Sequence, residues 1–476
     1  MTRHYPSALV WLRRDLRLED QAALARALSE AGQVTPVFLF DAAILAPLPR
    51  ADRRVEFIWE TVAGLKRELN GRGCDLLVRH GHAETEIPRL AEALGVQAVY
   101  CSRDYEPAAI ARDAAVEREL AARSVPLLDV KDQVVFERDE ITTAAGGAYH
   151  VFTPYKAAWL KALTPDHVAP QPVGARAAGF ALREPEPMVP LEALGFERTD
   201  LPALGIRPGP TGAQALFEDF QGRIDAYGQT RDYPGVKGSS YLSVHLRFGT
   251  ISIRRLVRFA LERGGEGAFA WLGELIWREF YQQLLWRRPD TVEHAFQHVF
   301  DRLDYPDDEA LFSAWRGART GYPLVDAAMR QLVETGWMHN RLRMVTASFL
   351  TKDLLVDWRW GERWFAERLI DYDMASNLGG WQWSASVGCD AQPWFRIFNP
   401  VTQSERFDAE GRFIRRYVPE LAGLTGRALH APWRASPAEL EAAGVVLGQT
   451  YPAPIVDHAA QRPKALALFE RAKQSS

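Results

Sequence analysis

The sequence predicts an α/β parallel-sheet, Rossmann-like N-terminal domain followed by a mostly α-helical C-terminal domain. Strand and helix patterns alternate over residues 1–135, which is typical of a parallel sheet with helices on both faces. Nine of the 29 prolines fall between residues 165 and 210, which indicates a long irregular connection. From residue 212 strand patterns give way to long amphipathic segments. We therefore expect an α/β domain over 1–135, a linker over 136–211 and a helical domain over 212–476.

The elements of the first domain have clear individual signatures. Short apolar runs predict strands at 7–12, 34–40, 75–78, 96–101 and 127–130. Segments with apolar residues at helical spacing predict helices at 21–31, 53–69, 84–94 and 107–123. Asp20 is expected to cap the first helix, because a short carboxylate accepts hydrogen bonds from the free N–H groups of a helix start. In the second domain, helices are expected at 267–286, 323–336, 341–355 and 361–370.

Composition limits the class of protein. The chain has 476 residues, of which 25% are charged, and its net charge is -4. No run approaches the roughly 20 apolar residues of a membrane span, and the first residues lack a signal-peptide core, so we expect a cytoplasmic protein. Its three cysteines, Cys74, Cys101 and Cys389, are too few and too far apart for a disulfide framework or a four-cysteine metal site. The acidic balance argues against a generic nucleic-acid coat but allows a local basic pocket.

Tryptophan is concentrated in the helical domain. Twelve of the 15 tryptophans lie between Trp271 and Trp433, which suggests stacking on a flat ligand or electron transfer. On a helix, Trp271, Glu274 and Arg278 share one face, with Trp277 at its edge. The arrangement predicts a carboxylate held beside an aromatic wall. The alternative is an exposed Glu–Arg pair beside packed aromatic residues.

Two later segments combine polar and aromatic residues. In 335–344, Asn340 and Met344 are four residues apart and can face one cavity, although a helix with solvated arginines is the alternative. In 371–383, two aspartates, an asparagine, a glycine pair and two tryptophans are hard to explain by packing alone. Asp371 is expected to pair with an arginine such as Arg343. No histidine or glutamate lies near the aspartates in the sequence, so we expect no metal site.

Two loops are candidates for binding anions. Between residues 227 and 243, the pair Ser239–Ser240 follows glycines and presents hydroxyl and N–H groups that could cradle a phosphate. An ordinary serine turn is the alternative. Arg13, Arg14 and Arg17 follow the first strand, where open α/β sheets bind ligands beyond the carboxyl ends of their strands. Solvated charge is the alternative there.

Taken together, these segments resemble the photolyase/cryptochrome family, in particular the cyclobutane pyrimidine dimer photolyases of the class I type. The resemblance runs from residue 11 to about 421 and is most specific in 271–281, 320–355 and 371–400. It implies an α/β domain that carries a light-harvesting antenna and a helical domain that binds FAD non-covalently and DNA. It also implies that photoexcited reduced FAD passes an electron to a dimer flipped out of UV-damaged DNA, single- or double-stranded. The dimer ring then splits and the electron returns.

The resemblance assigns roles to individual residues. The implied FAD contacts are Tyr227, Ser239, Ser240, Leu242, Ser243, Trp271, Arg278, Trp337, Arg343, Asp371, Asp373 and Asn377, with Asn377 at flavin N5. The implied catalytic pocket consists of Glu274, Trp277, Asn340, Met344, Asn377 and Trp383. The implied DNA contacts are Trp277, Arg341, Trp383 and Arg396. The implied electron-transfer chain is Trp381, Trp358 and Tyr305, where a third tryptophan is usual; Trp360 or Trp315 is the alternative end.

The resemblance also bears on the antenna chromophore, because some positions of this chain match the family's chromophore-binding residues and others differ from them. Ala108, Ala109 and Glu293 stand where folate-binding members carry other residues, so folate is not expected. Arg14, Asp104, Glu106 and Arg247 resemble the deazaflavin-binding pattern, with Arg247 in place of a lysine. A second chromophore of deazaflavin or flavin type is therefore favoured over folate, although the site could be empty.

Two other functions remain open at this stage. A cryptochrome-type blue-light photoreceptor would bind FAD without repairing DNA, but Asn377 and the pair His339–Asn340 resemble repair enzymes. A nucleotide-binding α/β protein with a helical partner domain would bind no flavin. We expect a monomer, the usual state in the family.

Overall fold

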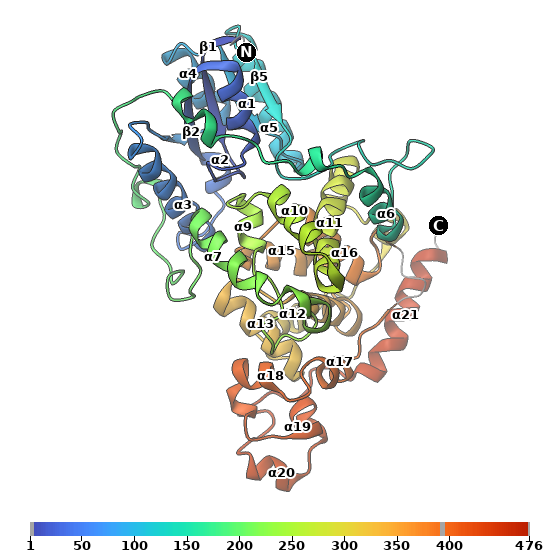
Figure 1. Cartoon of the computed structure of the whole chain (residues 1–476). Coiled ribbons are helices and arrows are strands. Elements are labelled where there is room, and N and C mark those ends of the chain that lie inside the picture. The colour runs from blue at the N-terminus through green and yellow to red at the C-terminus, as the bar shows by residue number, and fades with distance from the viewer. Residues whose placement is uncertain (1–3, 391–395, 475–476) are drawn as a thin grey trace. The chain divides into compact units, whose positions relative to one another are not determined.

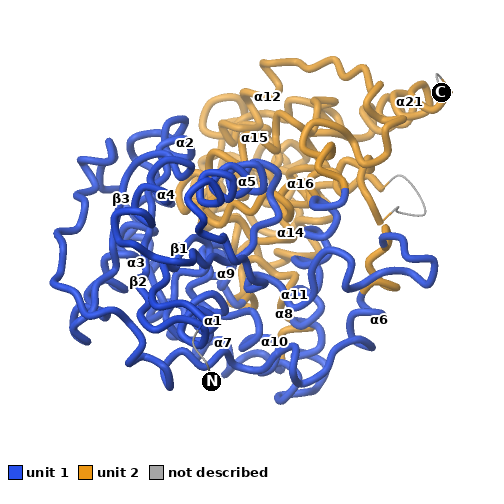
Figure 2. Tube along the Cα trace, turned by 90° about the horizontal axis from the view of Figure 1, so that it is seen from above, with its two compact units in different colours: residues 1–148, 156–225, 240–287 blue, residues 149–155, 226–239, 288–476 orange. Residues whose placement is uncertain are grey.

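The computed structural model describes residues 4–390 and 396–474, which form two compact units (Figure 2). Unit 1 comprises 1–148, 156–225 and 240–287, and unit 2 comprises 149–155, 226–239 and 288–476. The α/β and helical fold classes are confirmed, because the five-stranded sheet lies in unit 1 and every named element after β5 in the described residues is a helix. The units cut across the expected boundaries at 135 and 212. The division into antenna and FAD-binding domains is one of function and stays a prediction.

The sheet of unit 1, drawn as the blue and cyan arrows of Figure 1, is entirely parallel. It contains β1 (Tyr5–Leu12), β2 (Ala31–Asp41), β3 (Leu77–Gly81), β4 (Ala98–Ser102) and β5 (Leu127–Val130), in the order β3-β2-β1-β4-β5. In the register of the central strand, Val10 lies between Pro36 of β2 and Tyr100 of β4. The chain proceeds to one side of β1 through β2 and β3, and then to the other side through β4. The carboxyl ends of β1 and β4 therefore form the topological switch point, where open α/β sheets bind ligands.

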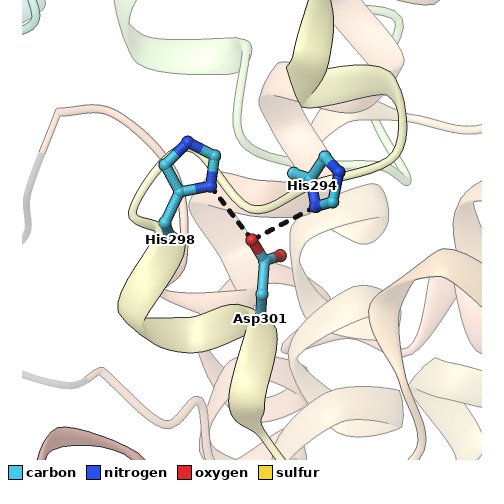
Figure 3. A group of neighbouring side chains, drawn as sticks. All are labelled: His294, His298 and Asp301. Atoms are coloured by element: carbon cyan, nitrogen blue, oxygen red, sulfur yellow. Dashed lines mark hydrogen bonds and ion pairs between the residues drawn. The ribbon is translucent and has the colours of Figure 1, made fainter. Parts of the chain in front are cut away.

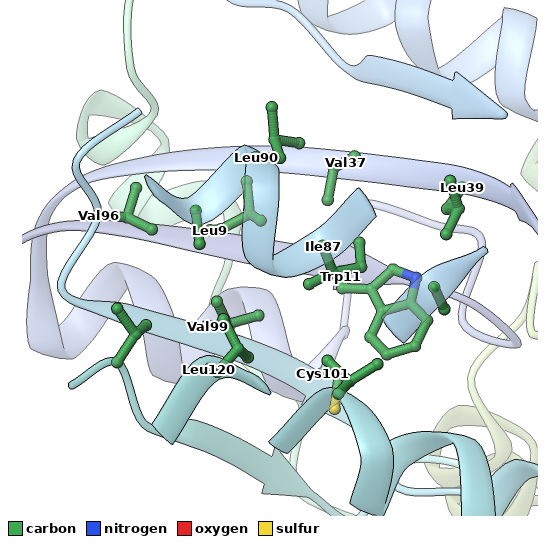
Figure 4. Close-up of a cluster of buried hydrophobic side chains, with 14 of the residues drawn as sticks. Leu9, Trp11, Val37, Leu39, Ile87, Leu90, Val96, Val99, Cys101 and Leu120 are labelled. Atoms are coloured by element: carbon green, nitrogen blue, oxygen red, sulfur yellow. The ribbon is translucent and has the colours of Figure 1, made fainter. Parts of the chain in front are cut away.

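Helices connect the strands and cover an apolar core. They are α1 (Ala22–Glu30), α2 (Ala42–Leu45), α3 (Arg53–Asn70), α4 (Ala83–Ala93) and α5 (Pro107–Ala121). Figure 4 shows Leu9, Val37 and Val99 from three strands packed with Ile87 of α4 and Leu120 of α5, all nearly inaccessible to solvent. This burial results from the continuous apolar runs typical of strands covered on both faces.

The expected cap of α1 is wrong by one residue. The side chain of Gln21, not Asp20, accepts a hydrogen bond from the Leu24 backbone N–H at the start of the helix. Asp20 instead has a left-handed backbone with φ of 49°. Its Oδ1 accepts from the Arg254 guanidinium and from the Gln171 backbone N–H. The Asp20 carboxylate therefore binds residues far along the chain instead of the N–H groups at the start of α1.

The rest of unit 1 leads from the sheet into helices. An irregular stretch with three short 3₁₀ helices follows α6, as the prolines predict. The elements are α6 (Phe152–Ala162), η1 (Pro165–Val168), η2 (Gly174–Gly179), η3 (Glu192–Leu194), α7 (Gly209–Gln221), η4 (Ile224–Ala226), α9 (Ser243–Phe248), α10 (Ile253–Arg263) and α11 (Gly265–Arg287). The first four residues of α6 and the last residue of η4 belong to unit 2. Side chains of α11 bind backbone groups of residues 133–141: Arg278 donates to Gln133, and Gln283 donates to Arg138 and Ile141. These bonds tie α11 to the segment that follows β5.

Every named element in the described part of unit 2 is a helix. Its elements are α8 (Tyr227–Thr230), η5 (Pro289–Val292), η6 (His298–Arg302), α12 (Glu309–Arg316), α13 (Pro323–Thr335), α14 (Asn340–Ser348), η7 (Phe349–Asp353), α15 (Trp358–Arg368), α16 (Met374–Ala385), α17 (Pro400–Phe407), α18 (Arg412–Tyr417), η8 (Pro419–Leu421), α19 (Gly426–His430), η9 (Pro432–Arg434), α20 (Pro437–Ala442) and α21 (His458–Gln474). The helix expected over 341–355 is continuous in sequence but changes to a π-helix at η7. No helix in the described residues is long and apolar enough to cross a membrane.

Candidate functional site

Helix α11 carries four of the predicted residues in unit 1. Trp271 is buried: its indole packs at 4.9 Å from the Phe220 ring and at 6.5 Å, nearly parallel, from the Phe217 ring of α7. Trp277 and Glu274 are only half-buried, and the Trp277 ring lies 5.3 Å from that of Tyr281. Aromatic neighbours therefore fix both indoles on a rigid helix.

Arg278 and Glu279 anchor α11 to the segment that leaves the sheet. Arg278 donates to the Gln133 carbonyl at 2.7 Å. Glu279 is buried, and its carboxylate accepts from the backbone N–H groups of Val135 at 2.6 Å and Phe136 at 3.0 Å and from the Trp159 indole. Burial raises the pKa of Glu279 to about 7, because the surrounding apolar volume disfavours its charge more than the three donors favour it. Sequence reasoning missed Glu279, because its partners are mostly backbone groups far along the chain.

The serine-rich turn is divided between the units. Tyr227 and Ser239 belong to unit 2, and Ser240, Leu242 and Ser243 belong to unit 1. Gly238 is required here, since a Cβ would lie 2.5 Å from the Thr230 carbonyl oxygen. Tyr241 adopts φ of 58°, which turns the chain sharply before α9. Ser240 Oγ accepts weakly from the Leu242 N–H at 3.4 Å.

In unit 2 the predicted pairing of Arg343 and Asp371 is present. Arg343 Nη2 lies 2.8 Å from Asp371 Oδ2, and Arg343 Nε donates to the Met338 carbonyl at 2.9 Å. His339 caps α14 by accepting from the Arg341 N–H. Burial lowers the pKa of His339 to about 4, so the ring is neutral near pH 7. This network fixes the start of α14, where Asn340 is exposed, and Met344 follows half-buried one turn later. Trp337, just before the helix, lies edge-on to the His339 ring.

Helix α16 presents the other predicted flavin contacts. Asp373 caps the helix by accepting from the Ser376 N–H. Asn377 is buried and donates from Nδ2 to Glu362 Oε1 at 2.9 Å and to the Glu362 carbonyl at 3.2 Å. Because Nδ2 is held by Glu362, the acceptor Oδ1 points the other way. Glu362 was missed by sequence reasoning, which had no signal linking α15 to α16. Trp383 lies half-buried near the end of α16.

The tryptophans of the predicted electron-transfer chain are buried. Trp381 lies edge-on to Phe365 at 5.0 Å and to Trp315 at 6.1 Å. Its Nε1 is buried and has no partner in the described part of the chain. The hydroxyl of Tyr305 is likewise buried without a partner among the described residues, and burial holds its pKa well above the usual value. Within the described residues, the Tyr305 hydroxyl therefore has no hydrogen-bonded acceptor for its proton.

The two predicted phosphate-binding arginines differ in environment. Arg341 Nη2 pairs with Asp232 Oδ1 at 2.8 Å, and its guanidinium stacks over the Phe407 ring at 4.5 Å. Arg396 is exposed, and its carbonyl accepts from buried Lys352 at 2.9 Å. Residues 391–395, within the predicted segment 371–400, lie outside the described residues.

The four predicted antenna residues lie together at the switch point of the sheet. Arg14 follows β1, and Asp104 and Glu106 follow β4. Glu106 Oε1 accepts from Arg14 at 2.8 Å and from Arg247 at 2.7 Å, while Asp104 lies 3.4 Å from Arg14. Burial opposes ionisation of Asp104, but the nearby arginines hold its pKa below the usual range. The two positive and two negative charges balance within one partly buried cluster.

Two protein-family models match this chain, one in its N-terminal part and one in its C-terminal part. A family model described as DNA photolyase matches residues 8–174, and one described as the FAD binding domain of DNA photolyase matches 271–471. The chain belongs to the DNA photolyase family. It is 42% identical to an Escherichia coli protein named deoxyribodipyrimidine photo-lyase, with 100% of both chains covered. A bacterial class III photolyase from Agrobacterium tumefaciens superposes with a TM-score of 0.90 at 36% identity, covering 100% of this chain and 99% of that one.

An archaeal photolyase from Sulfolobus tokodaii, described as holding two FAD molecules, superposes with a TM-score of 0.81 at 32% identity and covers 98% of this chain and 100% of that one. The residues present suit a flavin. Asn377 offers an oriented acceptor, Arg343 and Asp371 form an ion pair, and Trp381 carries a buried N–H without a described partner. A Cβ on Gly380 would meet no atom within 4 Å, so there is open space beside α16.

Proposed function

We propose that this photolyase-family protein uses blue light to reverse cyclobutane pyrimidine dimers in DNA. The observation that carries the proposal is the relationship to deoxyribodipyrimidine photo-lyase over the full length of both chains. When bound, reduced FAD supplies the excited electron. The oriented carboxamide of Asn377 supports repair over a photoreceptor role, since an acceptor suits the N–H that reduced flavin carries at N5.

The chain's own residues would bind and position the substrates. Glu274 and Asn340 would donate to or accept from the pyrimidine edges, where charge develops during ring splitting. Trp277, Met344 and Trp383 would supply apolar surface for the flipped bases; photolyases are themselves an example of base-flipping enzymes in general accounts of the process. The FAD would be held by the residues assigned to it above, and Arg341 and Arg396 would contact phosphates.

Product analysis tests this function. Reduced protein is mixed with an oligonucleotide that contains either a cyclobutane dimer or a (6-4) photoproduct, and chromatography follows each lesion in blue light and in darkness. Light-dependent loss of the cyclobutane dimer alone supports the proposal. Repair of the (6-4) lesion alone, or no repair by flavin-loaded protein, contradicts it.

We also infer an antenna of deazaflavin or flavin type at the cluster of Arg14, Asp104, Glu106 and Arg247. Support comes from their position at the switch point and from the similar archaeal photolyase described with two FAD molecules. Reconstitution with each chromophore tests this: Arg247→Ala should weaken uptake by roughly tenfold, the cost of one charge-assisted hydrogen bond. Folate uptake that Arg247→Ala does not alter would contradict the assignment. A cytoplasmic monomer remains our expectation.

A further inference from the structure

Three metal-ligating side chains converge on the segment around η6, outside every residue assigned above. The Nδ1 atoms of His294 and His298 both point toward Asp301 Oδ2, at 3.3 Å and 3.0 Å (Figure 3). The two imidazoles are 55% and 60% exposed, and the Asp301 carboxylate is 23% exposed. The group is therefore accessible from solvent and needs no large side-chain movement to act together.

The two nitrogen–oxygen separations are close to those around a tetrahedral metal ion. Zinc binds imidazole nitrogen at about 2.0–2.1 Å and carboxylate oxygen at about 2.0–2.2 Å, which places tetrahedral ligand atoms roughly 3.3–3.5 Å apart. The two nitrogen–oxygen distances, 3.3 Å and 3.0 Å, are close to this range, and all three atoms lie within 4.8 Å of one another.

Neighbouring groups orient the ligands. Asp301 Oδ1 accepts from the Ala295 N–H at 2.7 Å and from Arg359 at 3.0 Å, so Oδ2 is the oxygen that faces the histidines. On the other side of His298, Nε2 lies 3.4 Å from Asp290 Oδ2. Because the Arg288 guanidinium, 3.0 Å from this nitrogen, can only donate, Nε2 accepts in this structure. A metal at Nδ1 requires the other tautomer, in which Nε2–H can donate to Asp290.

Two arginines oppose a bound cation. Arg288 pairs with Asp290 and lies 3.0 Å from His298 Nε2, and Arg359 pairs with Asp301. Their positive charge lowers the affinity for every cation, so an ion must gain strongly from imidazole ligands to bind. Mg²⁺ and Ca²⁺, which prefer oxygen ligands, are therefore disfavoured relative to Zn²⁺ and other first-row divalent ions.

We propose that His294, His298 and Asp301 form a binding site for one first-row divalent metal ion such as Zn²⁺, with water completing the coordination. The bound ion would link the loop after η5 to η6. The inference stands independently of the repair reaction, since it uses none of the residues assigned to FAD, dimer or antenna.

Zinc titration of the untagged, FAD-loaded full chain tests the site. After treatment with a chelator, isothermal titration calorimetry with Zn²⁺ alone should give one ion per chain. His294→Asn and His298→Asn should each weaken binding at least about tenfold, which corresponds to ~1.4 kcal/mol. His80→Asn, which removes an exposed histidine of β3, should leave the dissociation constant unchanged. Circular dichroism confirms that the variants remain folded.

Two results would overturn the proposal. The first is no saturable binding, in which case the three side chains form a hydrogen-bonded cluster only. The second is binding that survives both histidine substitutions, which places the ion elsewhere. X-ray absorption at the zinc edge gives an independent test: nitrogen and oxygen at about 2.0–2.1 Å are expected, whereas a sulfur ligand at about 2.3 Å would indicate a cysteine and contradict the site.

Discussion

Asn377 of α16 donates from Nδ2 to the Glu362 carboxylate of α15 at 2.9 Å. A second bond to the Glu362 carbonyl, at 3.2 Å, uses the other hydrogen of the same nitrogen. The carboxamide can therefore adopt only one orientation without losing both bonds. Glu362, which no sequence pattern indicated, determines how the residue proposed at flavin N5 presents its oxygen.

Glu362→Ala should shorten the lifetime of the reduced flavin in air and lower the midpoint of thermal unfolding. Removing the acceptor leaves a buried amide hydrogen unsatisfied, which costs ~1–3 kcal/mol, and lets Asn377 rotate. Glu362→Gln is the matched control, because its carbonyl can still accept and its effect should be much smaller. Equal reoxidation rates in wild type and Glu362→Ala would show that Glu362 does not position Asn377.

Glu274→Ala should keep FAD but lower the yield of repaired dimers per absorbed photon. Loss of a hydrogen bond worth ~1 kcal/mol corresponds to about fivefold in a competing rate. Flavin absorbance of the purified variant checks cofactor content, and Glu262→Ala, an exposed carboxylate on α10, serves as the control. An unchanged yield would remove Glu274 from the mechanism.

Tyr305→Phe should slow photoreduction of oxidised flavin by external reductants, while repair by pre-reduced protein stays normal. The buried hydroxyl of Tyr305 has no described acceptor for its proton, so we expect Tyr305→Trp to photoreduce faster than wild type. Transient absorption measures both rates. If Tyr305→Phe matches wild type but Trp315→Phe is slow, the route leaves Trp381 through the adjacent Trp315 ring instead.

Arg341→Ala should weaken binding to dimer-containing DNA at every sequence. Loss of one phosphate contact should reduce the slope of log affinity against log salt by about 1. In the absence of DNA, Asp232 holds this guanidinium in place. Arg72→Ala, which removes an exposed arginine of unit 1, is the control; an identical salt slope for wild type and Arg341→Ala would refute the contact.

The raised pKa of Glu279 predicts a pH dependence of stability. Its folded pKa, about 7, exceeds the unfolded value of about 4.3, so the folded state binds more protons between these values. The free energy of unfolding should therefore decrease as pH rises from about 4.3 to 7. Denaturant titrations at several pH values measure this trend. Glu279→Gln should flatten it, and a trend that persists unchanged in Glu279→Gln would have to arise from other groups.

The sequence predicts the features that depend on local pattern. Apolar runs bounded by turns determine the five strands, and helical spacing predicts α11 and α13. The pairing of Arg343 with Asp371 was also accessible, because complementary charges stood in two motifs of unusual composition. The cap of α1 could not be predicted in this way, because Asp20 forms hydrogen bonds with Arg254 and Gln171, more than a hundred residues away.

Polar groups that act across the fold escaped prediction. Glu279 and Glu362 lie in helical patterns where a glutamate usually faces solvent. Both are nevertheless buried and accept hydrogen bonds from other segments of the chain. The cluster of His294, His298 and Asp301 was not predicted for a different reason. Two histidines and one aspartate with spacings of four and three match no known metal-binding motif, and only the turn at η6 brings them together.

Light-dependent repair tests the central claim most directly. Purified reduced protein is mixed with UV-irradiated oligothymidylate, and absorbance in the thymine band is followed in blue light and in darkness. Our account predicts that absorbance recovers in light only, and that Glu274→Ala slows the recovery at equal flavin content. No recovery in light from fully reduced, flavin-loaded protein would contradict dimer repair and favour a blue-light photoreceptor.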